Sequence, residues 1–328
     1  MSVLVTGGTG FVGTHVVNAL LRRGHEVAVL ARDPSGTRNR YNRPVEAAPG
    51  NVLDPASLDA ALAGREALVH LVGIIHEKGE QTFDRMHRAA VECAVGAARR
   101  AGVRRLLHMS AMGASEDSPS EYGRTKAAGE EAVRDSGLDW TIFRPSVIFG
   151  LGDGFFSLLA PIVRHNPLFI PVIGPGTTKF QPVSVHDVAR VFADSLEKPE
   201  TVGKTFEVGG PQVFTLDEIY REVAIAVGKP RKRLVHFPLW WGRFLAGRFE
   251  WMARRGLLPA PPLTRDQLKS LSRDSTADVS ETVAAFGGEW QELRAGLRES
   301  IRGGFRHDPR SGFGEEIELE RVKTIRIR

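Results

Sequence analysis

The chain has a single cysteine, Cys93, among its 328 residues. One thiol excludes an internal disulfide framework and any metal site built from a cysteine cluster. A chain without disulfides is typical of a reducing compartment, so we expect a cytoplasmic protein. We expect Cys93 itself to be a small buried hydrophobic residue in the middle of a helix.

Long apolar runs are also missing. No stretch approaches the ~18 apolar residues that a membrane-spanning helix needs. The N-terminus enters an apolar strand without a basic n-region or cleavage pattern, so we expect no signal peptide. Helix-turn-helix, zinc-finger and RNP patterns are absent, so we expect no nucleic-acid partner despite a net charge of +5. The histidines lack the spacing of a metal site, and we expect no metal.

The start of the chain carries the strongest motif. A short apolar strand over Val3–Thr6 leads directly into glycines and then into an amphipathic helix. The first glycine allows a tight turn, the second lets the backbone approach a pyrophosphate, and the third lets the helix pack closely on the sheet. The N–H groups at the start of the helix then face the phosphates. This arrangement predicts dinucleotide binding by the residues Gly7, Thr9, Gly10, Phe11, Val12 and Gly13.

Strands and helices alternate over the first ~150 residues, which predicts a parallel sheet covered on both faces. The expected strands are Val3–Thr6, Glu26–Ala31, Leu68–Val72, Leu106–Ser110 and Thr141–Arg144, with a weaker one near Val45–Ala47. The expected helices follow Asp54, run over Thr82–Ala101, and run over Tyr122–Arg134 behind a capping box at Ser118–Glu121.

We therefore predict an α/β fold, a Rossmann-type doubly wound parallel sheet with a smaller C-terminal substrate lobe. The NAD(P)-binding domain is residues 1–150, to which a helix at 184–200 returns. The smaller lobe is 151–183 together with 201–328. Within it, 303–328 fits either a solvent-facing strand or a loose tail.

The end of the second strand usually selects the cofactor, because an acidic residue there binds the ribose diol of NAD. Arg32 stands at that place, with further arginines behind it. A guanidinium can grip a 2′-phosphate through paired hydrogen bonds, so we favour NADP(H) over NAD(H). Two alternatives stay open: Asp33 reaches the diol, or the segment is a solvated basic loop.

Five further positions follow strands or turns at the expected cofactor edge. By position alone, the adenine side and the adjoining strand end are lined by Asn51, Val52, Leu71, Val72 and Gly73.

Ser110, Tyr122 and Lys126 form the candidate catalytic group. The tyrosine and the lysine are four residues apart on a predicted helix and share one face. The serine ends a strand at the carboxyl edge of the sheet, where open α/β sheets bind ligands. A neighbouring ammonium would lower the tyrosine pKa and bring its hydroxyl nearer to acid–base use at neutral pH. The serine would hold a substrate carbonyl or alcohol.

Three motifs together resemble the short-chain dehydrogenase/reductase superfamily: Thr6–Gly13, Tyr122–Lys126 and Arg144–Gly150. Within it, the chain is similar to the extended or atypical group that includes the NAD(P)H-binding accessory subunit of respiratory complex I. The segments His70–Ile75, His108–Ala114, Phe180–Ala189 and Glu207–Pro211 carry that closer resemblance. It covers about residues 1–225 and thins towards the C-terminus.

The resemblance implies that Tyr122 is the acid/base, that Lys126 binds the nicotinamide ribose, and that Pro145 and Val147 contact the cofactor. The asparagine that completes the proton relay in the superfamily has no clear counterpart, and His87 occupies its expected position. Members of the complex-I-like group often bind the nucleotide without a known turnover. The resemblance thus implies either a reductase or a non-catalytic NADPH-binding assembly protein. A nucleotide-sugar epimerase or dehydratase is a further alternative, which the short gap between Ser110 and Tyr122 disfavours.

Two other segments need an interpretation. Phe237–Arg255 mixes three tryptophans with four arginines, which is typical of a helix at the inner face of a membrane or of a pocket for a quinone or lipid-like substrate. An ordinary packed helix with exposed arginines fits as well. The pair His186–Asp187 fits a catalytic pair, but we rather expect the aspartate to cap a helix and the histidine to reach the substrate pocket or the contact between the lobes.

Overall fold

The computed structural model describes residues 1–37, 40–258 and 261–302. Its centre is a seven-stranded sheet in the order β11-β6-β5-β4-β1-β2-β3, in which every neighbouring pair is parallel. The strands are β1 (Ser2–Thr6), β2 (Glu26–Ala31), β3 (Glu46–Pro49), β4 (Ala67–His70), β5 (Arg105–Met109), β6 (Asp139–Pro145) and β11 (Lys204–Val208). This sheet confirms the Rossmann-type α/β fold.

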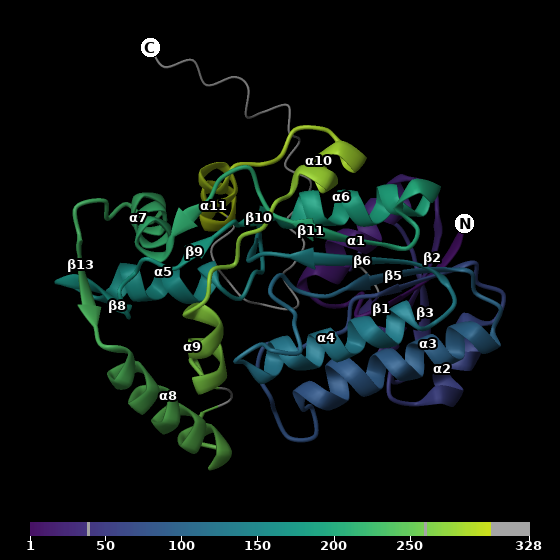
Figure 1. Ribbon diagram of the computed structural model, residues 1–328, viewed down its shortest axis with the longest axis horizontal. Coiled ribbons are helices and arrows are strands. Elements are labelled where there is room, and N and C mark those ends of the chain that lie inside the picture. The colour runs from purple at the N-terminus through teal and green to yellow at the C-terminus, as the bar shows by residue number, and fades with distance from the viewer. Residues whose placement is uncertain (38–39, 259–260, 303–328) are drawn as a thin grey trace.

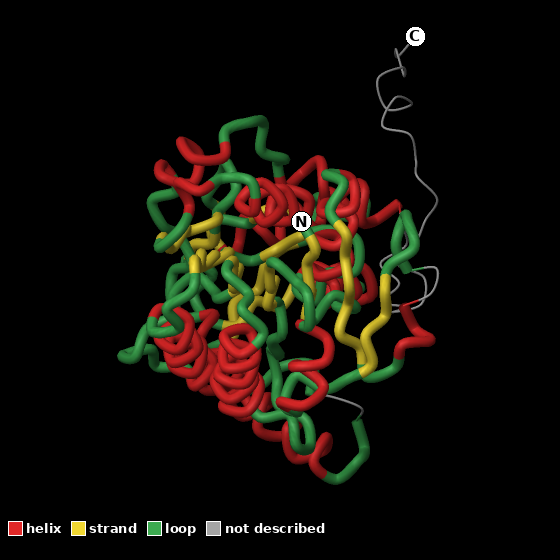
Figure 2. Tube along the Cα trace, turned by 90° about the vertical axis from the view of Figure 1, so that its right-hand side faces the viewer, coloured by secondary structure: helices red, strands yellow, loops and turns green. Residues whose placement is uncertain are grey.

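Helices cover both faces of the sheet (Figure 1). One face carries α1 (Phe11–Arg22) and α6 (Val185–Leu196), and the other carries α2 (Pro55–Leu62), α3 (Ala90–Arg100) and α4 (Glu121–Arg134). Viewed from the side, the strands lie between these two helical layers (Figure 2).

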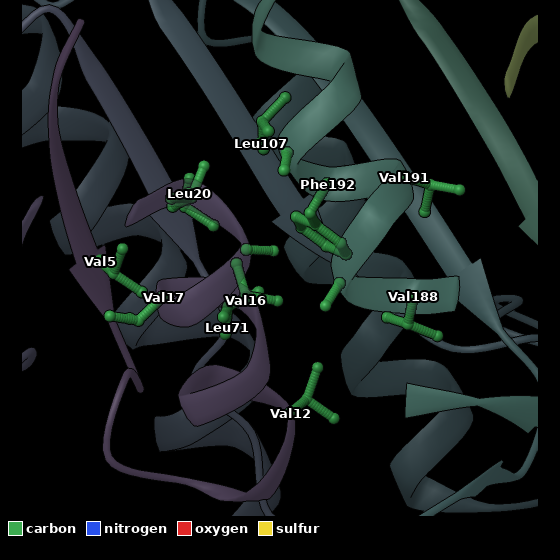
Figure 3. Close-up of a cluster of buried hydrophobic side chains, with 14 of the residues drawn as sticks. Val5, Val12, Val16, Val17, Leu20, Leu71, Leu107, Val188, Val191 and Phe192 are labelled. Atoms are coloured by element: carbon green, nitrogen blue, oxygen red, sulfur yellow. The ribbon is translucent and has the colours of Figure 1, made fainter. Parts of the chain in front are cut away.

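The strands are apolar on both faces because both faces are buried. Val5 of β1 lies in the cluster under α1 and α6, whereas Leu4 lies in the cluster under α2 and α3. Figure 3 shows the first cluster, which includes Leu20 of α1 and Phe192 of α6.

A buried arginine ties this first unit together. Arg105 of β5 is 6% exposed, and its guanidinium donates to the hydroxyls of Thr141, Ser195 and Thr201 at 2.8 Å each. These hydroxyls belong to β6, to α6 and to the short helix η3 (Pro199–Thr201). One side chain therefore joins two strands to the segment that returns from the second lobe.

The second lobe packs around its own apolar cluster, which includes Phe156, Ile219 and Leu297. Three two-stranded ladders border it: β7 with β10, β8 with β13, and β9 with β12. Their strands are β7 (Ile148–Phe149), β8 (Phe169–Ile173), β9 (Lys179–Phe180), β10 (Val183–Ser184), β12 (Phe214–Thr215) and β13 (Arg233–Phe237). The helices are α5 (Phe156–His165), α7 (Leu216–Ala226), α8 (Leu239–Arg254), α9 (Arg265–Leu271), α10 (Ser280–Phe286) and α11 (Leu293–Arg302).

The boundary predicted between the two units needs a correction. The prediction assigned 201–328 to the smaller lobe, but β11 (Lys204–Val208) pairs in parallel with β6 and forms the edge of the main sheet. A five-residue strand can pair with a sheet formed by distant parts of the chain. Its own sequence does not indicate which strand it pairs with, so the boundary could not be predicted. The predicted strand or tail at 303–328 lies outside the described residues.

Three local predictions also differ from the structure. The helix expected over Thr82–Ala101 contains a π-helical turn, η2 (Arg85–Ala89), directly before α3. Separately, a short helix, η1 (Pro34–Thr37), follows β2. The cap of α4 is Ser120 rather than Ser118, because the Ser120 hydroxyl accepts from the Gly123 N–H at 3.1 Å. The cap of α6 is Ser184, one residue after β10 begins.

Candidate cofactor and catalytic site

The glycine turn between β1 and α1 has the geometry that a bound pyrophosphate needs. Gly7 has a φ of +76°, which favours glycine, and the Gly10 N–H donates to the Gly7 carbonyl at 3.0 Å. A Cβ on Gly13 would lie 2.1 Å from that same carbonyl oxygen, so only glycine lets α1 start this close to the turn. Among the described residues, no side chain caps α1 and its first turn holds no acid. The N–H groups of this turn are thus directed at an anion.

The loop that follows β4 abuts this turn. A Cβ on Gly7 would lie 2.9 Å from the Leu71 carbonyl carbon, and a Cβ on Gly73 would lie 3.0 Å from Lys126 Nζ. Beyond it, the Met112 N–H donates to the Pro145 carbonyl at 2.9 Å, and Val147 follows at the same edge of the sheet. The carboxyl ends of β1, β4, β5 and β6 therefore meet around one place, as expected for a ligand site in an open α/β sheet.

The other predicted cofactor contacts differ in how open they are to a ligand. Val52 and Leu71 are buried in the two cores, at 8% and 5% exposure. Asn51 is exposed, but its Oδ1 accepts from the Leu53 N–H at 3.1 Å. Val72 is half-buried, and Gly73 and Thr9 are exposed at the edge.

The residues after β2 can be sorted by their contacts. Asp33 Oδ1 accepts from the N–H and the hydroxyl of Ser35, which leaves it turned into its own loop. Arg32 is exposed beside it. Arg40 reaches back to the glycine turn, where its Nη1 donates to the Thr9 carbonyl at 3.2 Å. The region beside the turn is therefore cationic, and its nearest carboxylate is already hydrogen-bonded.

Lys126 and Ser110 lie together below this edge. Both side chains are 3% exposed, and Lys126 Nζ donates to the carbonyl of Met109, the residue before Ser110, at 3.1 Å. The Ser110 hydroxyl has no hydrogen-bond partner among the described residues. A buried polar atom without a partner is uncommon in proteins, and a ligand oxygen would satisfy this one. The glycine turn, Gly73 and this hydroxyl together fit a nicotinamide dinucleotide.

Tyr122 lies one helical turn before Lys126 on α4. Its ring packs edge-on against His87 and Phe83, with centroid separations of 5.1 and 5.9 Å. The N–H groups of Glu121 and Tyr122 donate to the carboxylate of Asp266 on α9 at 2.9 and 3.2 Å. Helix α4 is thus held at its start by a residue from the second lobe.

The prediction that Lys126 lowers the pKa of Tyr122 is wrong for this structure. Burial raises the pKa of Tyr122 to about 12. Burial also lowers the pKa of Lys126 to about 8, although the Glu130 carboxylate opposes this shift. Burial is the cause of the Tyr122 shift, and the Lys126 ammonium is bonded to the Met109 carbonyl.

Three neutral histidines surround the lysine. Burial and the Lys126 ammonium lower the pKa of His87 to about 2 and that of His70 to about 3, and burial holds the pKa of His108 well below its usual range. His87 Nδ1 pairs with the Thr125 hydroxyl at 3.0 Å, and its Nε2 lies 3.0 Å from the Ile74 carbonyl. His87 therefore bridges α4 and the loop after β4, at the position where the resemblance expects an asparagine.

Sequence reasoning missed two contributors to the site. Thr125 lies inside the Tyr122–Lys126 motif but was given no role, and it pairs with His87. Asp266 is more than a hundred residues away in the chain, and nothing near it in the sequence indicates its role. The pair His186–Asp187 is also corrected: the Asp187 carboxylate accepts from the Gln291 N–H and does not cap α6, and the His186 ring meets His15 of α1 at 5.0 Å.

The described residues contain no group of three or more His, Cys, Asp or Glu side chains placed to hold a metal ion. No helix in this part of the chain combines the length and the apolar character needed to cross a bilayer.

Comparison with known proteins agrees with this geometry. The chain is 32% identical over 294 residues to the mitochondrial NADH dehydrogenase [ubiquinone] 1 alpha subcomplex subunit 9 of Arabidopsis thaliana, covering 86% of this chain and 72% of that protein. It is 33% identical over 237 residues to a ceramide reductase of Caulobacter vibrioides, covering 72% and 73%. Among solved structures, the UDP-glucose 4-epimerase of Thermotoga maritima superposes with a TM-score of 0.68 at 20% identity, covering 92% of this chain and 98% of that one.

The last comparison shows the fold alone, because its identity is low. A family model described as NAD(P)H-binding matches residues 7–199, which includes the glycine turn, Ser110, Tyr122 and Lys126. The match spans more than half of the chain and coincides with the site built above. The chain belongs to this NAD(P)H-binding family.

Proposed function

We propose that this protein is an NAD(P)-dependent oxidoreductase of the short-chain dehydrogenase/reductase type, acting on a small or lipid-like carbonyl or alcohol. One observation carries the proposal. The buried Lys126 lies beside the unpartnered Ser110 hydroxyl and one helical turn from Tyr122, at the edge of the sheet where the glycine turn opens. Groups of this kind at that edge suit proton transfer to a bound oxygen.

In this proposal each residue has one role. The dinucleotide, when bound, supplies or accepts the hydride. The Ser110 hydroxyl donates to the substrate oxygen and orients it. Tyr122, which stays a neutral phenol because burial raises its pKa to about 12, donates its proton to that oxygen during reduction. Lys126 holds the ribose of the nicotinamide, and Gly73 keeps the space in front of its ammonium clear.

We further propose NADPH as the preferred cofactor. Arg40 bonds the Thr9 carbonyl of the glycine turn, Arg32 is exposed just after β2, and the adjacent acid, Asp33, is bonded to Ser35. A 2′-phosphate would meet two guanidinium groups here, whereas a ribose diol would have to displace the serine from the carboxylate.

A second candidate function is a non-catalytic NADPH-binding protein that assembles with a respiratory complex. The observation that favours it is the Lys126 ammonium, which bonds the Met109 carbonyl instead of activating Tyr122. Its relative from Arabidopsis is also named as a subunit of NADH dehydrogenase. In this case the dinucleotide would be structural, and Tyr122 would serve only in packing.

The substrate that we propose is lipid-like or a quinone, taken up by a cytoplasmic protein at the inner face of a membrane. Support comes from the exposed aromatic side chains of α8, which are Trp240, Phe244 and Trp251, and from the relative that is named a ceramide reductase. The structural match to an epimerase shows the fold alone, so we do not extend it to the reaction.

The first experiment identifies the dinucleotide released when the purified protein is denatured. The emptied protein is then titrated with NADPH and NADH, together with Arg32→Ala and a control, Arg43→Ala, whose guanidinium bonds the far end of α1. We expect NADPH to bind at least about tenfold more tightly than NADH, and Arg32→Ala alone to remove that difference. An NADH preference that Arg32→Ala leaves unchanged contradicts the assignment.

Turnover separates the two candidate functions. NADPH oxidation is followed with long-chain ketones, quinones and azo dyes, using Tyr122→Phe and the control Tyr220→Phe, a buried tyrosine of the second lobe. A reductase exchanges its cofactor rapidly and loses ~100-fold or more in kcat when the Tyr122 hydroxyl is removed. Tight, slowly exchanging NADPH with no turnover that depends on Tyr122 supports the assembly protein instead.

A further inference from the structure

One helix of the second lobe exposes aromatic side chains to solvent. In the part of the chain that the structure describes, the exposed Trp, Tyr and Phe side chains are Trp240 (68%), Phe244 (60%) and Trp251 (45%), and all three lie on α8. Their spacing of four and seven residues puts them on one side of the helix. Exposed aromatic groups in a row mark an interaction surface rather than ordinary packing.

The opposite side of α8 accounts for its packing. Ala246 is fully buried, a Cβ on Gly242 would lie 2.4 Å from Ile173 of β8, and Trp241 stacks on Phe237 at 4.8 Å. The inner face therefore fixes the helix on the β8–β13 ladder. The outer aromatic residues stay exposed, so packing of this helix does not account for them.

Arginines alternate with these aromatic residues. Arg243 and Arg254 are exposed on the same side and form no ion pair among the described residues. The guanidinium groups of Arg248 and Arg255 lie over the Trp251 ring, at 5.8 and 4.6 Å from its centroid. We call Trp240, Arg243, Phe244, Trp251 and Arg254 the aromatic-basic face.

The charge of the whole chain is concentrated around this face. Residues 239–273 hold seven Lys or Arg and two carboxylates, a net charge of +5, which equals the formal net charge of all 328 residues. Both carboxylates are engaged: Glu250 accepts from the Arg265 N–H and Asp266 from the start of α4. A groove of about 630 Å³ lies between α8 and α9, lined by Trp240, Arg243, Phe244, Arg265 and Lys269.

This face is connected directly to the candidate site. In Figure 1, α9 lies between α8 and the start of α4. Asp266 of α9 holds the N–H group of Tyr122, and Gln267 Nε2 donates to the Ile75 carbonyl at 3.3 Å. Ile75 follows the cofactor loop and is itself 56% exposed. Whatever binds the aromatic-basic face therefore lies next to the mouth of the site.

We propose that the aromatic-basic face docks this protein on an anionic lipid bilayer. This proposal rests on the membrane contact suggested under the proposed function. It adds which surface makes the contact and which lipid charge it prefers, and it does not depend on catalysis. Tryptophan and phenylalanine side chains enter the headgroup region, and the arginines meet lipid phosphates. The excess of arginine without carboxylate partners selects an acidic lipid over a neutral one and over an apolar protein surface. Docked in this way, the groove between α8 and α9 faces the bilayer.

The test measures sedimentation of the full-length protein with vesicles of phosphatidylcholine alone and with about one third phosphatidylglycerol. We expect binding to the anionic vesicles only, weakening as salt is raised. Arg243→Ala with Arg254→Ala should weaken binding about tenfold, since each basic side chain near an anionic surface contributes an attraction. Trp240→Ser with Phe244→Ser should weaken it by a similar factor.

A charge-matched control distinguishes a specific face from general basicity. Arg99→Ala with Arg164→Ala removes two exposed arginines from α3 and α5 and should leave vesicle binding unchanged. Equal loss in both arginine pairs overturns the proposal, and so does equal binding to both kinds of vesicle. NADPH titration of the same samples separates the two proposals. Protein that binds NADPH but not vesicles overturns docking alone, and protein that binds vesicles but not NADPH overturns the oxidoreductase alone.

Discussion

Arginine has opposite surroundings in the two halves of this molecule. On the sheet, Arg105 is buried and donates to Thr141, Ser195 and Thr201. On α8, Arg243 and Arg254 are exposed, with no ion pair among the residues that the structure describes. The first arginine stabilises the fold and the others are available to a partner. The net charge of a chain therefore indicates a binding surface only after the buried and paired cations have been identified.

Replacing one arginine in each half tests most directly whether the buried and the exposed arginines have different roles. Arg105→Met should lower the free energy of unfolding by about 2–4 kcal/mol, because three buried hydroxyls lose a charged donor. Arg243→Met should change it by less than about 0.5 kcal/mol, as exposed substitutions usually do. Urea denaturation followed by circular dichroism measures both. Equal stability of the two variants would contradict the roles assigned to these side chains.

Two glycines, one in each half of the molecule, allow a second comparison. A Cβ on Gly13 would lie 2.1 Å from the Gly7 carbonyl oxygen, and a Cβ on Gly247 would lie 2.2 Å from Arg265 Nη2. The first neighbour is backbone in a tight turn, whereas the second is the end of a flexible side chain. Gly13→Ala should therefore cost about 1–3 kcal/mol and weaken NADPH binding more than about tenfold. Gly247→Ala should be neutral, or stabilise by up to about 1 kcal/mol through helix propensity.

Thermal unfolding and NADPH titration of the two glycine variants provide the measurement. If Gly247→Ala destabilises as much as Gly13→Ala, the end of the Arg265 side chain is held in place and cannot move aside for a methyl group. If Gly13→Ala binds NADPH normally, the glycine turn is not the pyrophosphate site.

Local patterns predicted the sheet half well, and the reason is physical. Strands such as Glu26–Ala31 are apolar on both faces. In the first turn, glycine is required where the backbone of residues nearby in the sequence comes too close for a Cβ atom. The spacing of Tyr122 and Lys126 likewise depends only on one helix. Features of this kind depend only on residues that are close in the sequence, so they can be recognised without knowing any long-range contact.

Long-range contacts explain what was missed. The strand Lys204–Val208 joins the sheet only through its pairing with β6, and Asp266 reaches the start of α4 from another lobe. The pKa of Lys126 depends on its burial and on the Glu130 carboxylate, and its ammonium bonds the Met109 carbonyl, none of which a four-residue spacing reveals. Ser118 and Ser120 both fit a helix cap by type, and the turn before the helix decides between them.

Lysine extends the comparison to the chemistry of the site. Burial lowers the pKa of Lys126 from 10.5 to about 8 in the folded protein. Between these values the unfolded chain binds a proton that the folded one does not, so stability rises with pH across this window. Below about pH 8 both states are charged, and the folded protein carries the full desolvation penalty. Lys126→Met should therefore raise the free energy of unfolding by about 1–2 kcal/mol at pH 7, while abolishing tight NADPH binding.

Denaturation at several pH values tests this sign. The advantage of Lys126→Met should be largest below pH 8 and should vanish above about pH 10.5, as the wild-type lysine becomes neutral in both states. Lys269→Met, at an exposed position on α9, should differ from wild type by less than about 0.5 kcal/mol throughout. A destabilised Lys126→Met at pH 7 would show that the lysine contributes to the fold through its bond to Met109.

The smallest effect is expected where the two halves meet. Asp266 of α9 accepts from the N–H groups of Glu121 and Tyr122, and so acts as a cap for α4 supplied from the second lobe. Asp266→Ala should lower the free energy of unfolding by about 0.5–1 kcal/mol, the size of a partly exposed cap, and Asp278→Ala, an exposed local turn acceptor, by less. Because Ser120 still caps α4, NADPH affinity should stay within about twofold. A larger fall in that affinity would show that α9 transmits strain to Tyr122, and that lipid at α8 can reach the chemistry through this carboxylate.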